Sequence, residues 1–291
     1  YMNDYVIVTD SCCDLSDVLV KKSELTVIPM ILTLGGKEYK NYPDNREITP
    51  KDFYARLRGG ENASTAAINM DVFTAVFEEI LNQGKDVLYL GFSSGLSSTY
   101  HVSTVVAEEL AAKYPERKIF CVDTLAASMG EGLLAYLAAQ KKKQGAEIEE
   151  VRDFVLENRL HLCHWFTVDD LNHLKRGGRV SATTALVGSL LNIKPILHVD
   201  DEGHLINVGK VRGRKASIEK IFENMKASAV NPSAQTVFIS HGDCEEDALT
   251  LKKMVEKEFK PKDIQINAIG PVIGAHSGPG TLAVFFLGTQ R

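Results

Sequence analysis

The stretch Val87-Leu-Tyr-Leu-Gly-Phe-Ser-Ser-Gly-Leu-Ser-Ser-Thr-Tyr100 decides how this chain is expected to fold. Its first part is a continuous apolar run, short enough for a buried strand, that ends at Gly91. Hydroxyl groups and a glycine follow at once, and an amphipathic helix is expected to begin after Ser97 and Ser98. The stretch therefore predicts a buried strand that passes into a helix through a short polar turn.

This polar turn has the chemistry of an anion-binding site. A helix N-terminus leaves backbone N–H groups unpaired, and the helix dipole places partial positive charge at the same point. With the hydroxyls of Ser93, Ser94 and Ser97 beside them, these groups predict a ligand that carries a carboxylate or a phosphate. An ordinary turn with an N-cap serine needs the same residues, so the turn by itself leaves both interpretations open.

The same succession of strand, polar tip and helix occurs on both sides of the stretch. Residues 5–9 and 118–122 are short apolar strands that end in Asp10-Ser11 and Asp123-Thr124. Alternating strands and helices favour a parallel sheet covered on both faces, and such sheets bind ligands at the carboxyl ends of their strands. We therefore expect the three polar tips to lie along one edge of a sheet.

The second half of the chain predicts a mixed sheet. Strands are expected over 162–168, 195–199, 205–211, 236–240, 264–269 and 282–287, and an apolar helix over 181–191. The fold class is therefore α/β with two domains. Residues 1–158 would form a Rossmann-like parallel sheet with helices on both faces, and residues 159–291 a second α/β domain. A return of the C-terminal segment to the interface is left open.

Two segments outside the central stretch have compositions that would let a ligand approach the backbone. Residues 59–69 are expected to form a loop, in which Ser64 and Thr65 stand among alanines that would let a ligand approach the backbone. Thr49 and Pro50 predict the start of one helix, and Asp71 is expected to cap the next. His276 stands in a segment rich in glycine and proline, which is expected to be a loop that bends past a ligand.

The composition restricts the class of protein. The chain has 291 residues, of which 44% are hydrophobic, enough for two domains with cores of their own. A net charge of -5 argues against general nucleic-acid binding. No stretch reaches the ~20 apolar residues of a membrane span. We therefore expect a cytoplasmic protein without an integral membrane segment, and leave transient contact with a membrane open.

The five cysteines form no metal-binding pattern. Cys163 stands near His161 and His164, but in an extended segment His161 and Cys163 would face away from His164. Free thiols in a reducing compartment, and no metal or cofactor, are expected.

Four segments together resemble the DegV family, in order and in spacing. They are Val8-Thr-Asp-Ser11, the turn Ser93-Ser-Gly-Leu-Ser97 with Thr99-Tyr100, Leu174-Lys-Arg-Gly-Gly-Arg-Val-Ser181, and Gly270-Pro-Val-Ile-Gly-Ala-His-Ser-Gly-Pro-Gly280. The resemblance extends over the whole chain. It implies two α/β domains that bind a fatty acid, with the acyl chain in a tunnel.

The resemblance also implies a function and a set of site residues. Well-characterised members are the binding subunit of bacterial fatty acid kinase, without catalytic activity of their own. They present the carboxylate to a separate ATP-dependent subunit, which makes acyl phosphate for phospholipid synthesis. Thr65 would match the carboxylate-binding threonine, and Ser94, with Ser93 and Ser97 near it, the serine of the other arm. The chain has Ser64-Thr-Ala-Ala67 where the family has Thr-Ser-Gln-Pro, which leaves the choice between Ser64 and Thr65 open.

The same resemblance favours His276 as a donor to the carboxylate or to the acyl phosphate. Runs of positive charge usually form solvated surfaces, but in this acidic protein we favour a surface that docks the kinase subunit or its nucleotide phosphates. The residues of this docking surface would be Arg176, Arg179, Lys210, Arg212, Arg214 and Lys215.

The residues support a fatty acid on independent grounds. A fatty acid needs a dry channel for its tail and a few convergent donors for its carboxylate. Each buried methylene contributes roughly 0.8 kcal/mol, so the tail can supply most of the affinity. Neutral hydroxyls and N–H groups are enough to orient the head, and they leave the carboxylate nucleophilic.

Two other classes of function are alternatives to fatty acid binding. A serine-dependent hydrolase or transferase acting on a small acyl substrate would use Ser94, but this serine lacks a Gly-x-Ser-x-Gly motif and the sequence designates no His and Asp partners. A nucleotide-binding regulator would need Gly-x-Gly-x-x-Gly after the first strand, which is absent from the sequence.

Overall fold

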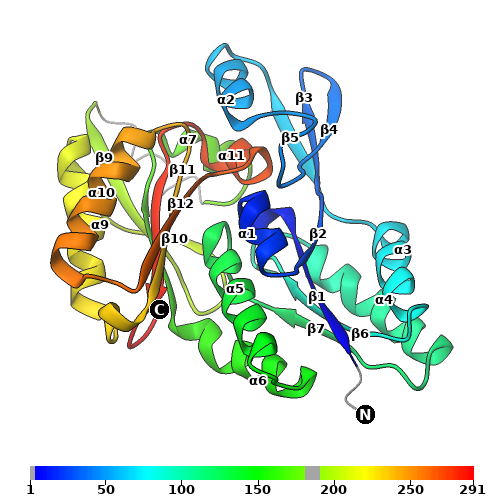
Figure 1. The fold of residues 1–291 in the computed structure, drawn as a ribbon. Helices are drawn as coiled ribbons and strands as arrows, with labels where there is room; N and C mark the ends of the chain where they lie inside the picture. The colour runs from blue at the N-terminus through cyan, green and yellow to red at the C-terminus, as the bar shows by residue number, and fades with distance from the viewer. Residues whose placement is uncertain (1–3, 181–190) are drawn as a thin grey trace.

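The computed structural model describes residues 4–180 and 191–291, which form three sheets with helices packed around them (Figure 1). The chain is an α/β protein, as the sequence predicts. The helix expected over 181–191 lies outside the described residues, except for Leu191 in a turn.

The first sheet is parallel, with the strand order β2-β1-β6-β7. The central strand β6 is buried along its whole length, which explains its continuous apolar sequence. Helices α3 and α4 pack against one face, and α5 and α6 against the other. The prediction of a parallel sheet covered on both faces is therefore confirmed. The bounds are β1 Tyr5–Asp10, β2 Thr26–Ile28, β6 Asp86–Gly91, β7 Ile119–Asp123, α3 Met70–Leu81, α4 Thr99–Lys113, α5 Met129–Lys143 and α6 Ile148–Asn158.

A small antiparallel sheet of order β4-β3-β5 stands beside the parallel sheet, with helix α2 next to it (Figure 1). Its third strand, β5, comprises Ala63–Ala66, so the prediction that residues 59–69 form a loop is wrong. The error has a physical reason, because small polar residues and alanines have little tendency to form strands and pairing with β3 decides the matter. The other elements are β3 Ile31–Leu34, β4 Lys37–Lys40 and α2 Pro50–Arg58.

The third sheet has six strands in the order β10-β9-β8-β13-β11-β12, and it is mixed, as predicted. Only β11 and β12 run parallel among its described pairs. Helices α9 and α10 cover its outer face. The bounds are β8 Leu162–Thr167, β9 Ile193–Val199, β10 Leu205–Arg212, β11 Thr236–His241, β12 Asp263–Ala268, β13 Leu282–Leu287, α9 Arg214–Ser228 and α10 Glu245–Phe259.

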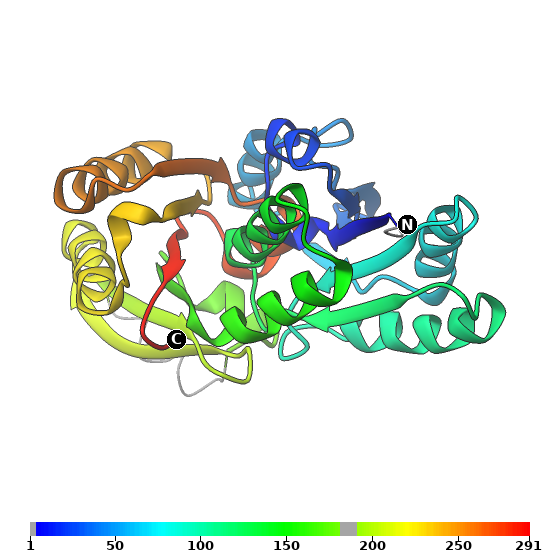
Figure 2. The same ribbon diagram turned by 60° about the horizontal axis from the view of Figure 1, so that its bottom comes forward.

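Helix α5 lies between the parallel sheet and the six-stranded sheet (Figure 2). It is rich in small and apolar residues, so it can pack against both sheets at once. Leu88 of β6 and Phe285 of β13 belong to one continuous core around it. The two sheets thus share a core, and residues that are distant in the sequence meet next to α5.

Short helices connect these layers. They are α1 Asp17–Lys22, α7 Asn172–Arg176, α11 Pro271–Ser277 and three 3-10 turns, Ser11–Cys13, Arg159–His161 and Pro232–Ala234. His276 lies in α11, so the expected loop at this position is wrong, because the segment begins as a helix with Pro271 in its first turn. Asn69, and not Asp71, caps α3. Among the described residues, every helix is too short or too polar to cross a bilayer.

Candidate functional site

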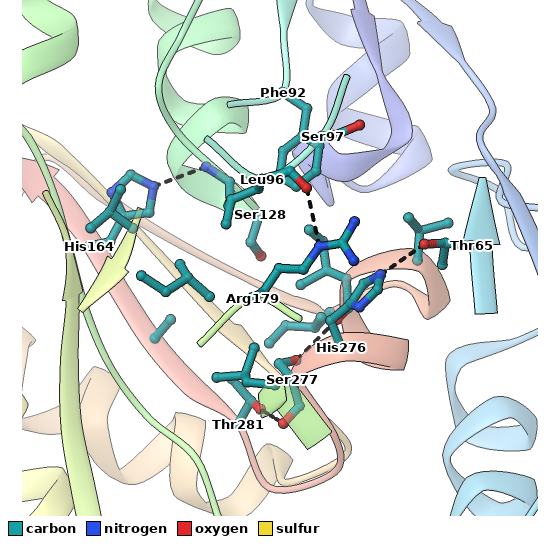
Figure 3. Close-up of a pocket in the computed structure, with 18 of the residues that line it drawn as sticks. Thr65, Phe92, Leu96, Ser97, Ser128, His164, Arg179, His276, Ser277 and Thr281 are labelled. Carbon is teal, nitrogen blue, oxygen red and sulfur yellow. Dashed lines mark hydrogen bonds between the residues drawn. The ribbon is translucent and has the colours of Figure 1, made fainter. Parts of the chain in front are cut away.

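A cavity of about 240 Å³ opens where the parallel sheet, the six-stranded sheet, β5 and α11 meet (Figure 3). Most of its wall is apolar. Most of the apolar residues come from the turns after β6 and β7, from the inner face of the six-stranded sheet and from α11, and the others from the segment before β3, from the end of β5, from α7 and from the end of β12. They are Met30, Ala66, Ala67, Phe92, Leu96, Ala127, Phe166, Leu174, Val199, Leu205, Ile269, Val272, Ile273, Ala283 and Phe285.

Thr65 and His276 form a polar pair at one part of this wall. Thr65 Oγ1 lies 2.8 Å from His276 Nε2, although the two residues are 211 positions apart in the sequence. Figure 3 shows the two side chains meeting from β5 and α11. The tertiary structure therefore brings together two of the five residues that the sequence assigned to the head-group site.

The strand geometry of β5 distinguishes Thr65 from its neighbour. Side chains alternate between the two faces of a strand, and in β5 Thr65 is half-buried while Ser64 is exposed. Thr65 lines the cavity and Ser64 is not among the described residues that do. The geometry therefore favours Thr65 at the position where the sequence left two candidates.

His276 is held as a neutral imidazole. Burial, with a smaller contribution from the nearby Arg179, lowers the pKa of His276 from 6.5 to about 4. Its Nδ1 is buried and has no hydrogen-bond partner among the described residues. A Cβ atom at Gly177 would lie only 2.4 Å from this nitrogen, so a glycine is needed for the ring to sit where it does. A neutral ring can give one N–H bond and accept one, which suits a carboxyl group.

Arg179 lines the cavity, whereas the sequence placed it on an outer docking surface. Its Nε donates to the backbone oxygen of Leu96 at 3.2 Å, and its Nη1 donates to the oxygen of Gly177. These two bonds turn the side chain inward, which the sequence pattern alone could not reveal. Nη2 has no partner among the described residues, and a guanidinium in the cavity wall is a group that can bind an anion through charge-assisted hydrogen bonds (Figure 3).

The three serines of the central turn have different environments. Ser93 is fully buried, and its hydroxyl donates to the backbone oxygen of Gly203 at 2.8 Å. The backbone N–H of Ser94 donates to Asp123. Neither serine is among the described residues that line the cavity, whereas Ser97 is. Ser93 thus joins the turn to the β9–β10 hairpin of the six-stranded sheet, and Ser94 joins it to the end of β7 in the same parallel sheet. The structure does not place these two serines with Thr65 in the cavity wall.

The hydroxyl of Ser97 forms a pair with the hydroxyl of Thr99, in which either group can be the donor. Its Oγ accepts from the backbone N–H of Thr99 at 3.2 Å and lies 2.9 Å from Thr99 Oγ1. Thr99 Oγ1 in turn accepts from the N–H of Ile68. When the Thr99 hydroxyl donates to Ser97, the proton of Ser97 remains available to a ligand.

The remaining predicted docking residues divide into two groups. Arg176, Lys210, Arg212 and Lys215 are exposed. Arg214 instead lies 3.3 Å from Asp169 and 2.9 Å from Asp247 in two ion pairs. Arg214 therefore connects α9 to its neighbours, which is a structural role that the sequence pattern did not reveal.

Six polar residues of the cavity wall were not assigned to the site from the sequence: Ser98, Ser128, His164, Ser240, Ser277 and Thr281. His164 Nε2 accepts from the N–H of Ala127 at 3.1 Å, and burial lowers the pKa of His164 well below its ordinary value. The Cys163 side chain belongs to the core on the opposite face of the sheet, as the alternation of β8 predicts. Ser128 follows Asp123-Thr124, the polar end of β7, and this position is the one sequence signal that could have indicated it. No sequence signal marks Ser240.

Comparisons with known proteins agree with this architecture. The family model described as "Uncharacterised protein, DegV family" matches residues 4–289. A DegV domain-containing protein of Clostridium perfringens is 50% identical over 290 residues, which cover 100% of this chain and 99% of that protein.

Solved structures show the same fold. A DegV family protein from Thermus thermophilus, whose structure is described by its fatty acid binding, superimposes with a TM-score of 0.87 at 29% identity, covering 97% of this chain and 98% of that one. A DegV lipid-binding protein from Thermotoga maritima gives a TM-score of 0.86 at 29% identity, with 99% of both chains covered. The shared fold, the family match along nearly the whole chain and the 50% identity show that this chain belongs to the DegV family.

Proposed function

We propose that this protein binds a long-chain fatty acid, with the tail buried in a tunnel formed by the cavity and the carboxylate held by Thr65, Ser97, Arg179 and His276. The observation that carries the proposal is the character of the cavity wall. It is apolar over most of its area, and it carries hydroxyl, imidazole and guanidinium donors that other described residues leave partly unused.

The chemistry of the wall matches the two parts of such a ligand. Burial of each methylene contributes roughly 0.8 kcal/mol, so the apolar wall provides affinity without specific contacts. Hydrogen bonds from an arginine to a carboxylate are charge-assisted and therefore fix its orientation. The structure of the Thermus thermophilus relative is described by its fatty acid binding, and a second Thermotoga maritima structure, 28% identical to this chain, is described as revealing a fatty acid binding function, which supports this class of ligand.

We also propose that the bound carboxylate is presented to a separate ATP-dependent kinase subunit in the cytoplasm, which converts it to acyl phosphate, and that this chain has no catalytic activity of its own. The exposed cations Arg176, Lys210 and Arg212 fit the docking surface for such a partner, because they have no ion pair among the described residues. The proposed docking surface leaves out Arg179, which lines the cavity, and Arg214, which forms two ion pairs.

The test of ligand binding is native mass spectrometry of the purified protein, followed by lipid extraction. We expect a co-purified fatty acid, or saturable binding of palmitate added to delipidated protein. Protein that neither carries nor takes up an acyl chain would refute the proposal.

The test of presentation uses the protein with a fatty acid kinase catalytic subunit and measures acyl phosphate. Arg212→Glu should leave palmitate affinity unchanged and slow acyl phosphate formation, since it reverses a charge on the docking surface. Lys257→Glu, an equal change of charge at an exposed position of α10, is the matched control. Equal rates for the two variants would remove Arg212 from the docking surface, and loss of palmitate binding would place it at the cavity.

A further inference from the structure

One part of the cavity wall is polar although its neighbours are apolar. Ser240 is fully buried on the inner face of β11. Its partner across the sheet is Ala283 of β13, and Ala283 pairs on its other side with Phe166 of β8. All three line the cavity. A buried hydroxyl in an otherwise apolar row needs a hydrogen-bond partner, because its burial without one costs roughly 1–3 kcal/mol.

Ser240 is one end of a short row of polar groups that leads to a buried carboxylate. Ser240 Oγ lies 3.0 Å from Ser128 Oγ, and Ser128 donates to Asp14 Oδ2 at 2.7 Å. The other oxygen, Asp14 Oδ1, accepts from the N–H of Gly270 at 3.0 Å. The row therefore joins β11, the turn before α5 and the segment after β1, and two of its members face the cavity.

The hydroxyl of Ser128 bonds within this row and does not cap the helix that it precedes. Ser128 is the N-cap residue of α5, yet its side chain makes no capping hydrogen bond. Serine is favoured at this position because its oxygen accepts from the first turn of the helix. Here the hydroxyl turns instead toward Asp14 and Ser240.

Ser240 Oγ makes one hydrogen bond among the described residues and can form further ones. When Asp14 is ionised, Ser128 gives it its only hydroxyl proton and accepts the proton of Ser240. Both lone pairs of Ser240 Oγ are then unfilled, as far as residues 4–180 and 191–291 are concerned. When Asp14 is protonated, the row reverses and Ser240 has a proton to donate. Burial raises the pKa of Asp14 to about 7, so both directions are accessible near neutral pH.

We propose that Ser240, supported by Ser128 and Asp14, is a second polar subsite of the cavity, and that it binds a hydroxyl group carried on the acyl chain of a hydroxy fatty acid. A hydroxyl group is both donor and acceptor, so it can pair with Ser240 in either direction of the row. In Figure 3, Ser128 and Thr65 are drawn apart with Arg179 and His276 between them. The subsite is thus distinct from the Thr65–His276 pair, and the inference rests on the proposed binding of a fatty acid.

The experiment measures the affinities of delipidated protein for palmitate and for its series of monohydroxy positional isomers. We expect one isomer, or two adjacent ones, to bind at least as tightly as palmitate. The other isomers should bind about tenfold more weakly, because their hydroxyl is buried against an apolar wall. Ser240→Ala should weaken the favoured isomer about tenfold and leave the affinity for palmitate within twofold.

Matched variants separate this role from a structural one. Ser217→Ala removes another fully buried serine hydroxyl, which bonds to the backbone oxygen of Arg214 on the outer side of the sheet. It should keep the preference for the favoured isomer. Should Ser240→Ala fail to fold, Ser128→Gly removes the supporting hydroxyl at a position with φ 52, where glycine is tolerated.

The outcomes distinguish the two proposals. If palmitate and all its isomers fail to bind, the proposed function is wrong. If palmitate binds but every hydroxy isomer is weakened alike, or if Ser240→Ala leaves the isomer preference intact, fatty acid binding stands and the second subsite is overturned.

Discussion

The turn after β6 and the junction of β5 with α11 are both polar, yet they use their polar groups in opposite ways. In the turn, the hydroxyl of Ser93 bonds to Gly203 of the β9–β10 hairpin, and the N–H of Ser94 bonds to Asp123. At the junction, Thr65 and His276 bond to each other and still face the cavity. The turn joins two parts of the chain, whereas the junction keeps its polar groups for a ligand.

The two regions differ in whether their polar groups are already bonded to the rest of the chain, and this difference distinguishes a candidate ligand site from a structural turn. A concentration of hydroxyls beside a helix N-terminus marks a place where the backbone needs partners, and most of those hydroxyls satisfy it. The candidate site lies where a side chain is held by hydrogen bonds and still has a nitrogen without a partner among the described residues, as Arg179 and His276 do. Substitutions at the junction should therefore change palmitate affinity, whereas substitutions in the turn should change stability.

Arg179→Ala should weaken palmitate binding about ten- to a hundredfold, because hydrogen bonds to a charged group contribute about 1.5–3 kcal/mol. Isothermal titration calorimetry at fixed ionic strength measures the affinity. Arg176→Ala, which removes an exposed arginine three positions away, should change it by less than about twofold. Equal affinities for both variants would mean that Arg179 does not contact the carboxylate.

His276→Gln should change how stability depends on pH. Because the pKa of His276 is lowered from 6.5 to about 4, the unfolded chain binds a proton between these values that the folded protein excludes. The wild type therefore loses stability as pH falls from 6.5 to 4, by about 3 kcal/mol from this group. Urea unfolding at pH 7 and pH 4.5 should show a smaller loss for His276→Gln than for Ser94→Ala. An identical loss would mean that the ring is not held neutral.

Thr65→Val should weaken palmitate binding about three- to tenfold, because it removes one neutral hydrogen bond and keeps the shape of the side chain. Ser64→Ala should have less than about a twofold effect, since Ser64 is exposed on the other face of β5. A fluorescent fatty acid displaced by palmitate measures both. The reverse ranking of the two variants would place Ser64 at the carboxylate and show that β5 is registered differently when ligand is bound.

Ser93→Ala should affect stability and not binding. It leaves the oxygen of Gly203 without its buried donor, which costs about 1 kcal/mol of unfolding free energy. Palmitate affinity should stay within about twofold of wild type. A loss of affinity without a loss of stability would return Ser93 to the carboxylate site.

Much of the architecture could be predicted from local patterns. The apolar run before Gly91 identified a central buried strand, and the polar tips of β6 and β7 identified the edge of the sheet at which the candidate site lies. Resemblance to the family pointed to Thr65 and His276. The sequence failed where pairing partners decide the outcome, because β5 is a strand only through its pairing with β3. It also misplaced the cap of α3, since it is the side chain of Asn69 that accepts from the N–H of Val72.

The order of strands and helices follows from hydrophobic periodicity and turn residues, which act within a few positions and can be read from the chain alone. Which polar groups face the cavity depends on how distant segments pack together. Arg179 turns inward because the backbone oxygens of Leu96 and Gly177 accept from it, and Ser240 meets Ser128 because α5 lies between two sheets. Such choices depend on contacts between distant parts of the chain, and periodicity carries no information about them.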